Sequence, residues 1–182
     1  MELRGSFLIA MPDLLDPNFH RTVVLVVEHD DEDGTVGLVI NRPTHVDARE
    51  FCASLDIQWV GAANDLVHSG GPVQPTMGWI LHGARDSQVD SGFVVDGVWA
   101  STSRRTLEWI ADKTELDRRV FGGYAGWAPG QLAEELRSGA WLTCPASADL
   151  VFHVPPDDVW ARALRAMGVD PAALVSGSRE LS

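Results

Sequence analysis

Residues 5–44 read GSFLIAMPDLLDPNFHRTVVLVVEHDDEDGTVGLVINRPT, and this stretch decides the fold. Three apolar runs, at 6–11, 22–29 and 35–41, have the length and the β-branched content of strands. The second run is continuously apolar and rich in valine, which is typical of a central strand covered on both faces. An acidic turn that ends in a glycine joins it to the third run, so we expect an antiparallel hairpin.

Beyond residue 43 the pattern changes from strands alone to a mixture of strands and helices. Asp47 can cap a helix at 47–56, and Ser103 can begin a second helix with one apolar face. Asp96 and Gly97 separate two short apolar runs, which predicts another hairpin. Further strands are expected at 65–68, 77–82, 119–124 and 150–154, and further helices at 129–139 and 156–168.

These elements predict an α+β fold with mainly antiparallel sheets packed against helices in a single compact domain. The chain has 182 residues, of which 45% are hydrophobic, and this is enough for one well-buried core but short for two. We assign residues 1–176 to the domain and predict that residues 177–182 form a flexible tail.

Charge and composition exclude several classes of protein. The net charge of −12 argues against direct nucleic-acid binding, because cationic surface supplies most of that affinity. The longest uncharged apolar run, 23–27, is far shorter than the roughly 20 residues of a membrane helix, and no export signal is visible. We therefore expect a cytoplasmic protein with no membrane association. Cys52 and Cys144 show no CxxC spacing and are expected to be buried thiols.

Glu28 and His29 are candidate catalytic residues at the end of the central strand. A histidine beside a carboxylate can act as a general acid or base, because its pKa lies near neutrality. Adjacent strand residues point to opposite faces, so both can serve one site only if a bulge intervenes. A hydrogen-bonded histidine at a strand end, beside a solvated acidic turn, is the preferred interpretation of the pattern. No second histidine has metal-ligand spacing, so we predict neither a metal nor a cofactor.

Arg21, Asn41 and Arg42 flank the central hairpin and are candidate ligand-binding residues. The first precedes the central strand and the other two follow its partner, so the three can meet at one end of the sheet. Two guanidinium groups there would hold a carboxylate or phosphate through paired hydrogen bonds. Salt bridges to Asp13, Asp16 or Glu28 are the competing interpretation.

Gly70 and Gly71, with Tyr124, Trp127 and Gln131, complete the candidate ligand-binding set. The glycines can bring backbone N–H groups close to an anion, although tight packing turns are the simpler interpretation. An aromatic wall with an amide suits a pocket, and core packing explains the same residues. We expect this group to converge with the ends of the central hairpin around one hollow.

Several blocks in fixed order resemble the bacterial AlgH/YqgE family. They are IAMPDLLDPNFHRTVV at 9–24, EHD at 28–30, GLVINRP at 37–43, SGGPVQ at 69–74, GWILH at 78–82, TSR at 102–104, GYAGWAPGQLAEEL at 123–136 and AWL at 140–142. The resemblance covers nearly the whole chain and implies sheets packed against helices in one unit. It also implies a transcriptional regulator without an agreed biochemical activity. Val27 stands where many members carry a cysteine, so thiol chemistry at that position does not transfer.

Two functions follow as expectations. The preferred one is a regulatory or adaptor protein that acts indirectly, through a small anionic ligand or a protein partner. The alternative is an enzyme of unknown class that uses His29 or Glu28 on an anionic substrate oriented by Arg21 or Arg42. The second requires the histidine and an arginine to line the same pocket. The residues do not indicate an oligomeric state.

Overall fold

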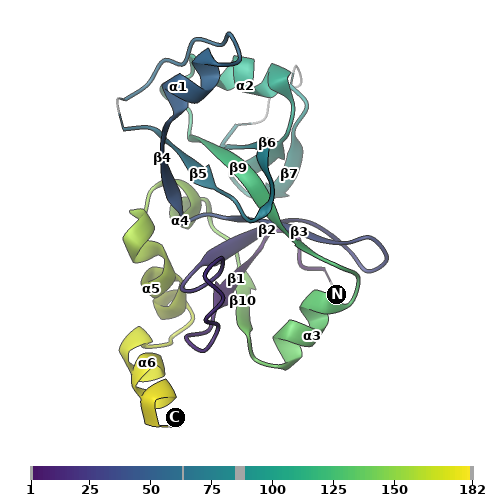
Figure 1. The fold of residues 1–182 in the computed structure, drawn as a ribbon, viewed down its shortest axis with the longest axis vertical. Coiled ribbons are helices and arrows are strands. Elements are labelled where there is room, and N and C mark those ends of the chain that lie inside the picture. Colours follow the sequence, from purple (N-terminus) through teal and green to yellow (C-terminus); the bar gives the residue numbers. More distant parts are fainter. Residues whose placement is uncertain (1, 63, 85–88, 181–182) are drawn as a thin grey trace.

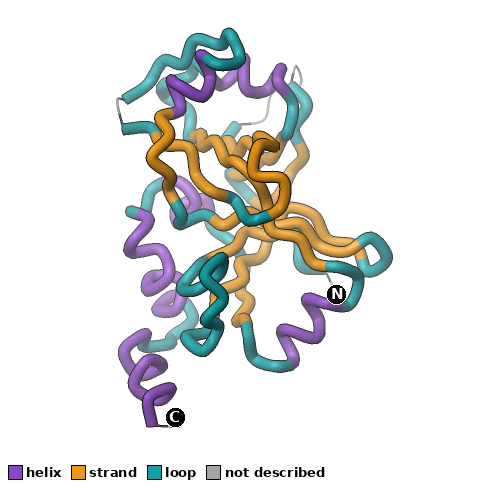
Figure 2. The backbone as a smooth tube through the Cα atoms, viewed as in Figure 1, coloured by secondary structure: helices purple, strands orange, loops and turns teal. Residues whose placement is uncertain are grey.

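The computed structural model describes residues 2–62, 64–84 and 89–180, which form a curled sheet with helices around it (Figures 1 and 2). This architecture confirms the α+β class and the single compact domain. The strands in the described residues are β1 (Ser6–Ala10), β2 (Val23–Asp30), β3 (Gly34–Val39), β4 (Pro43–Asp47), β5 (Leu66–Ser69), β6 (Val73–His82), β7 (Gly92–Val95), β8 (Val98–Ser101), β9 (Arg118–Trp127) and β10 (Trp141–Pro145). The helices there are α1 (Ala48–Ala53), α2 (Arg104–Ile110), α3 (Gln131–Arg137), α4 (Ala148–Phe152), α5 (Pro156–Ala166) and α6 (Pro171–Glu180).

The sheet follows the strand order β10-β1-β2-β3-β9-β6-β8-β7, and β4 with β5 leaves this path. Neighbouring strands pair antiparallel except β5 and β9, which are parallel. The last residues of β9 pair with β3, and its first residues pair with β6. β9 therefore runs through both halves of the molecule (Figure 1), and its two ends line different hollows.

The central hairpin forms as its sequence predicts. Residues 23–27 of β2 are buried, and alternate side chains enter two different core clusters, with Leu25 in one and Val24 in the other. This is the burial on both faces that the valine-rich run predicts. At the turn, the Asp30 carboxylate accepts hydrogen bonds from the backbone N–H groups of Glu32 (2.7 Å) and Asp33 (3.0 Å).

Helix caps also follow the sequence. The Asp47 carboxylate accepts the N–H of Arg49 at 2.7 Å and caps α1, and Ser103 caps α2 in the same way. The strand expected at 150–154 is wrong, because most of that segment lies in α4. Ser147 caps α4, and a five-residue apolar run does not by itself distinguish a strand from a buried helix.

The end of the chain is a longer helix than the short turn at 171–175 that its sequence suggests. α6 continues to Glu180 and extends away from the sheet (Figure 1). The domain boundary at 176 and the flexible tail at 177–182 stay predictions. None of the helices in the described residues is both long and apolar enough to cross a lipid bilayer.

Candidate functional site

One end of the β2–β3 hairpin forms a hollow of about 710 Å³ against α5 and α6, which we call the Arg21 hollow. Its lining residues are His20, Arg21, Asn41, Arg42, Pro43, Pro156, Asp157, Trp160, Ala161, Pro171, Ala172, Val175 and Ser176. The sequence-based expectation that Arg21, Asn41 and Arg42 meet at one end of the sheet is therefore confirmed.

Asn41 and Arg42 hold the loop that leads into β2. The Arg42 guanidinium donates to the carbonyl oxygens of Pro17 (3.1 Å) and His20 (2.7 Å). Asn41 accepts the N–H of Val23 at 3.0 Å and donates to the carbonyl oxygen of Arg21 at 3.0 Å. These bonds give both side chains a structural role that the salt-bridge interpretation did not anticipate.

Arg21 differs from its two neighbours because its guanidinium faces the hollow over an aromatic ring. The guanidinium carbon lies 5.1 Å from the ring centroid of Trp160, which is buried and anchored by a 2.8 Å hydrogen bond to the Ala10 carbonyl oxygen. The Arg21 backbone is left-handed, with φ of 53°. This conformation is unfavourable by about 1 kcal/mol or more for a residue other than glycine, and such residues cluster at functional sites.

The predicted catalytic pair lies in a second hollow of about 480 Å³, which we call the His29 hollow. Both residues border this hollow, but the register shift between β2 and β3 lies before Glu28, and Glu28 and His29 pair in regular register with Val36 and Thr35, so no bulge lies between the two candidates. His29 Nδ1 lies 2.7 Å from Thr35 Oγ1, and Nε2 lies 3.4 Å from Asp31 Oδ1. His29 is thus a hydrogen-bonded histidine at a strand end.

Tyr124 and Trp127 line the His29 hollow and not the Arg21 hollow. Trp127 donates to a carboxylate oxygen of Glu135, and Gln131 accepts the N–H of Ala128 at 3.0 Å, which closes the turn before α3. The side chains of Trp127 and Gln131 therefore have structural hydrogen-bond partners.

The expectation of one shared hollow is wrong. Trp127 pairs with Thr35 at the turn end of the β2–β3 hairpin, whereas Arg21 precedes the opposite end. The eight residues of β2 separate the two ends by roughly 25 Å at about 3.3 Å per residue. The strand order causes the separation, because β9 pairs with β3 only near the turn.

Gly70 and Gly71 serve close packing against β9. The N–H of Gly70 donates to the carbonyl oxygen of Gly122 at 2.9 Å, and its carbonyl oxygen accepts the N–H of Val39 at 2.8 Å. A Cβ atom on Gly71 would lie 2.2 Å from the carbonyl carbon of Tyr124. The geometry agrees with the packing interpretation, and anion binding by these glycines stays a prediction.

A third hollow, of about 410 Å³, lies where β4, β5 and the start of β9 face the loop before α5. We call it the His68 hollow, and our sequence analysis did not identify it. Its lining residues are Pro43, Ala48, Trp59, Asn64, Asp65, Leu66, His68, Arg118, Arg119, Val120, Pro155, Pro156 and Asp157. Pro43, Pro156 and Asp157 also line the Arg21 hollow, so the two are neighbours.

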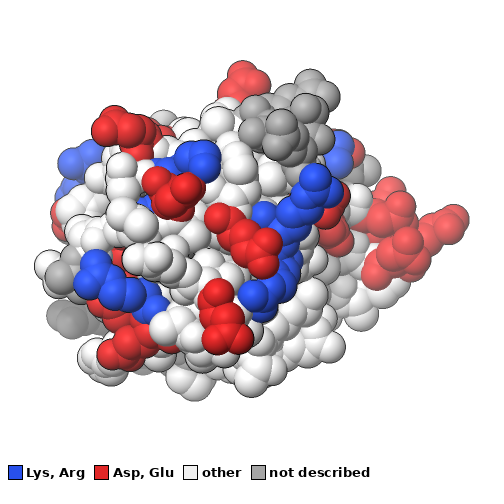
Figure 3. Space-filling view, turned by 90° about the horizontal axis from the view of Figure 1, so that it is seen from above, with Lys and Arg blue, Asp and Glu red and all other residues white. Residues whose placement is uncertain are grey.

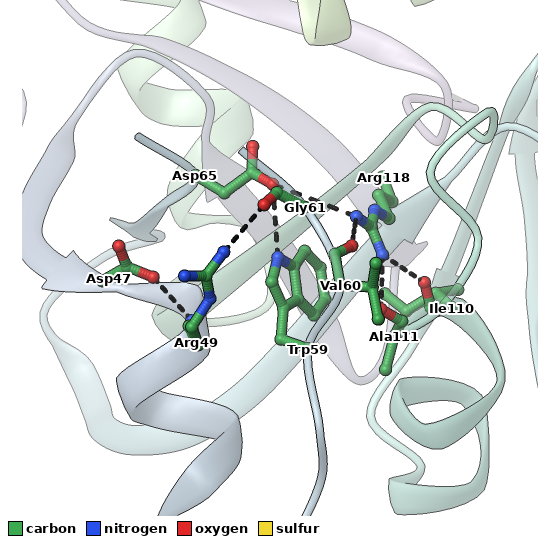
Figure 4. A network of polar contacts seen from close by, with 9 residues as sticks. All are labelled: Asp47, Arg49, Trp59, Val60, Gly61, Asp65, Ile110, Ala111 and Arg118. Atoms are coloured by element: carbon green, nitrogen blue, oxygen red, sulfur yellow. Dashed lines mark hydrogen bonds and ion pairs between the residues drawn. The ribbon is translucent and has the colours of Figure 1, made fainter. Parts of the chain in front are cut away.

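Arg118 organises one wall of the His68 hollow (Figure 4). Its side chain is 6% exposed and donates to the carbonyl oxygens of Ile110 (2.5 Å), Ala111 (2.9 Å) and Val60. The guanidinium carbon lies 3.9 Å from the ring centroid of Trp59. The Asp65 carboxylate lies 3.9 Å from the guanidinium and accepts the indole N–H of Trp59 at 3.2 Å.

Arg119 brings a second cation to the same hollow. Its terminal nitrogens donate to the carbonyl oxygens of Val151 (2.9 Å) and Phe152 (3.4 Å), the last residues of α4. A cation at this position complements the partial negative charge at a helix C-terminus. Burial lowers the pKa of both Arg118 and Arg119 below the ordinary value for arginine.

His68 lines the same hollow, and its ring contacts the ring of the core residue Phe121. Its side chain is buried, and Nδ1 lies 3.2 Å from the Leu66 carbonyl oxygen, which can only accept a hydrogen bond. The proton of the neutral ring is therefore on Nδ1. Nε2 is buried and has no hydrogen-bond partner among the described residues. Burial, reinforced by the charge of Arg119, lowers the pKa of His68 to about 4. Near neutral pH the ring is thus uncharged, with a free lone pair on Nε2.

This pKa makes the stability of the protein depend on pH. In the unfolded chain the histidine has a pKa near 6.5, so between about pH 6.5 and 4 the unfolded state binds more protons. Stability is full above pH 6.5 and is lost as the pH falls toward 4, by up to about 3 kcal/mol for this group. We expect His68→Phe to remove this part of the loss, measured by urea unfolding from pH 7.5 to 4.5.

The difference in stability between the wild type and His68→Phe reports on His68 alone. Burial also lowers the pKa of His82, but both proteins contain His82, so its contribution cancels. Parallel stability curves for the wild type and the variant would contradict the assignment.

The comparisons with known proteins give the family. The AlgH-like family model matches residues 7–172, which is most of the chain. The chain belongs to the AlgH-like family. Two AlgH-like relatives are a UPF0301 protein of Thioalkalivibrio sulfidiphilus, 43% identical over 95% of this chain and 93% of the relative, and one of Ralstonia nicotianae, 41% identical over 96% and 93%. The names of these relatives state no biochemical activity.

Two solved structures show the same fold. The solution structure of AlgH from Pseudomonas aeruginosa superposes with a TM-score of 0.77 at 38% identity, and the match covers 95% of this chain and 93% of that one. A crystal structure of a protein from Corynebacterium diphtheriae has a TM-score of 0.71 at 25% identity, covering 91% and 87%. The resemblance in the sequence blocks is confirmed at the level of family and fold.

Proposed function

We propose that this AlgH-like protein is a non-catalytic adaptor that binds an acidic segment of a partner protein in the Arg21 hollow. The observation that carries the proposal is the Arg21 guanidinium, which lies over Trp160 in an open hollow. Within the part of the chain that the structure describes, the Arg21 guanidinium forms neither an ion pair nor a hydrogen bond. Stacking on a buried indole orients the guanidinium, and its N–H groups can then donate hydrogen bonds to a carboxylate.

The rest of the lining favours a peptide segment over a bare anion. The hollow also has apolar lining residues, which are Pro43, Ala161, Pro171 and Val175. A carboxylate side chain beside an apolar residue would satisfy both parts of this surface. The hollow lies between two helices and is large enough for several residues of an extended chain.

The charge of the protein argues against nucleic acid as the partner. Acidic and basic side chains alternate on the face seen in Figure 3, which therefore lacks a continuous basic surface for a phosphate backbone. With a net charge of −12, any effect of this protein on transcription would be indirect.

The enzyme alternative has less support. It needs His29 and an arginine in one pocket, and the described residues that line the His29 hollow include no arginine. Arg21 and Arg42 lie at the other end of β2. The adaptor function is therefore preferred.

Arg21→Gln tests the adaptor proposal. Random twelve-residue peptides displayed on phage are selected on the wild-type protein, and we expect enrichment of Asp or Glu beside an apolar residue. Fluorescence anisotropy with the selected peptides should then show about tenfold weaker binding to Arg21→Gln, because one charge-assisted hydrogen bond contributes about 1.5 kcal/mol or more.

The matched control is Arg105→Gln, which removes the same charge from an exposed position on α2. It should leave the affinity unchanged. Equal losses of peptide affinity in the two variants would show that the change in net charge alone causes the effect. Selected peptides without acidic residues would refute the proposed class of partner.

A further inference from the structure

His68, which lines the hollow, has a buried hydrogen-bond acceptor that the described residues do not satisfy. With the proton on Nδ1, the lone pair of His68 Nε2 needs an N–H or O–H from elsewhere. Leaving a buried polar atom unpaired is unfavourable by about 1–3 kcal/mol. The histidine lines a hollow large enough for a small molecule, so a ligand can supply the missing donor.

The same hollow holds an excess of buried positive charge. Arg118 and Arg119 both line it, and one ion pair, between Arg118 and Asp65 at 3.9 Å, joins them to the described carboxylates. Asp65 and, more weakly, Asp117 also act as counter-charges on Arg119, and Asp117 is bound to His153 at 2.9 Å. The two bonds that Arg119 makes to α4 use two of its five N–H groups, which leaves donors for an anion.

The acceptors restrict which anion fits. Besides His68 Nε2, the carboxylates of Asp65 and Asp157 line the hollow. They would repel a fully ionised anion but would accept a hydrogen bond from one that keeps a proton. A metal cation is disfavoured by the two guanidinium groups. The described residues also contain no group of three or more His, Cys, Asp or Glu side chains placed to hold one.

We propose that the His68 hollow is a binding site for a protonated oxyanion, either inorganic phosphate or a small phosphate monoester. The guanidinium groups of Arg118 and Arg119 would bind its charged oxygens, and its O–H group would donate to His68 Nε2. This site is separate from the Arg21 hollow and does not depend on the adaptor function.

Phosphate and sulfate provide the test, because they share size and shape while only phosphate keeps a proton near neutral pH. The full chain, labelled with ¹⁵N, is titrated with each anion at pH 6 and constant ionic strength, and the imidazole nitrogens are followed by NMR. We expect phosphate to shift His68 Nε2, which then accepts a hydrogen bond, and to bind about tenfold more tightly than sulfate. The other five histidines serve as internal references.

Two variants show whether His68 makes the discrimination. His68→Phe keeps a planar ring without the lone pair, and backbone amide shifts should report phosphate binding about tenfold weaker with the preference over sulfate lost. Arg105→Gln, at an exposed position on α2, should leave both affinities unchanged. Glycerol 3-phosphate distinguishes the two sources, since tighter binding than inorganic phosphate indicates a monoester.

Three results would overturn the proposal. They are equal binding of sulfate and phosphate, a preference for phosphate that survives in a folded His68→Phe variant, and no shift of the His68 nitrogens with any of these anions. A change caused by Arg21→Gln alone would place the anion in the Arg21 hollow instead. If the peptide selection that tests the Arg21 hollow fails, the anion titration still tests the His68 hollow independently.

Discussion

Arg118→Met is expected to lower the free energy of unfolding by about 3–5 kcal/mol. The variant keeps an apolar stem but removes the donors that satisfy the carbonyl oxygens of Val60, Ile110 and Ala111. It also removes the guanidinium that covers Trp59. Urea unfolding followed by circular dichroism measures the change.

Arg137→Met is the matched control for this prediction. Arg137 is 72% exposed and pairs only with Glu134 among the described residues, so its replacement should change stability by less than about 0.5 kcal/mol. A loss of under 1 kcal/mol in Arg118→Met would show that water replaces the guanidinium at these carbonyls. In that case the wall in Figure 4 would not depend on Arg118.

Gly71→Ala is expected to destabilise the protein by more than about 3 kcal/mol. The new methyl group would lie 2.2 Å from the Tyr124 carbonyl carbon and 2.4 Å from the Ala125 backbone nitrogen. Neither atom can move without displacing β9, which pairs with β3, β5 and β6. Thermal unfolding monitored by circular dichroism, together with the yield of soluble protein, measures the effect.

Gly139→Ala separates steric overlap from backbone strain. Gly139 also has a positive φ, 79°, but a Cβ there would have no atom of the described residues within 4 Å, apart from its chain neighbours. Only the left-handed backbone opposes the alanine, so we expect a loss of about 1 kcal/mol. Similar losses in the two variants would mean that the contact with β9 relaxes, contrary to the packing role of Gly71.

Patterns that extend over several neighbouring residues were predictable. The valine-rich run at 23–27 needed burial on both faces, and the acidic turn at Asp30 needed hydrogen bonds to its own backbone. Asp47 and Ser103 capped helices because the cap and its partner N–H lie two residues apart. In each case the interaction energy lies within a short segment.

For the candidate site residues, the sequence predicted contacts within the hairpin but did not predict where distant strands would place the other residues. The meeting of Arg21, Asn41 and Arg42 followed from the hairpin, whose ends are close in sequence order. The placement of Trp127 did not follow, because the pairing of β9 with β3 joins residues about ninety positions apart. Nothing local in the β9 sequence indicates which strand it pairs with, or at which end.

The sequence by itself determined the α+β class, the central hairpin, two helix caps and the resemblance to the AlgH-like family. The tertiary structure alone decided that the candidate residues divide between two ends of one hairpin. It alone also placed His68 beside two buried arginines. The physical reason is that hydrogen bonds in turns and caps are short-range in sequence. The pKa of His68 and the charge in its hollow depend instead on β5, β9 and the loop before α5, which only folding brings together.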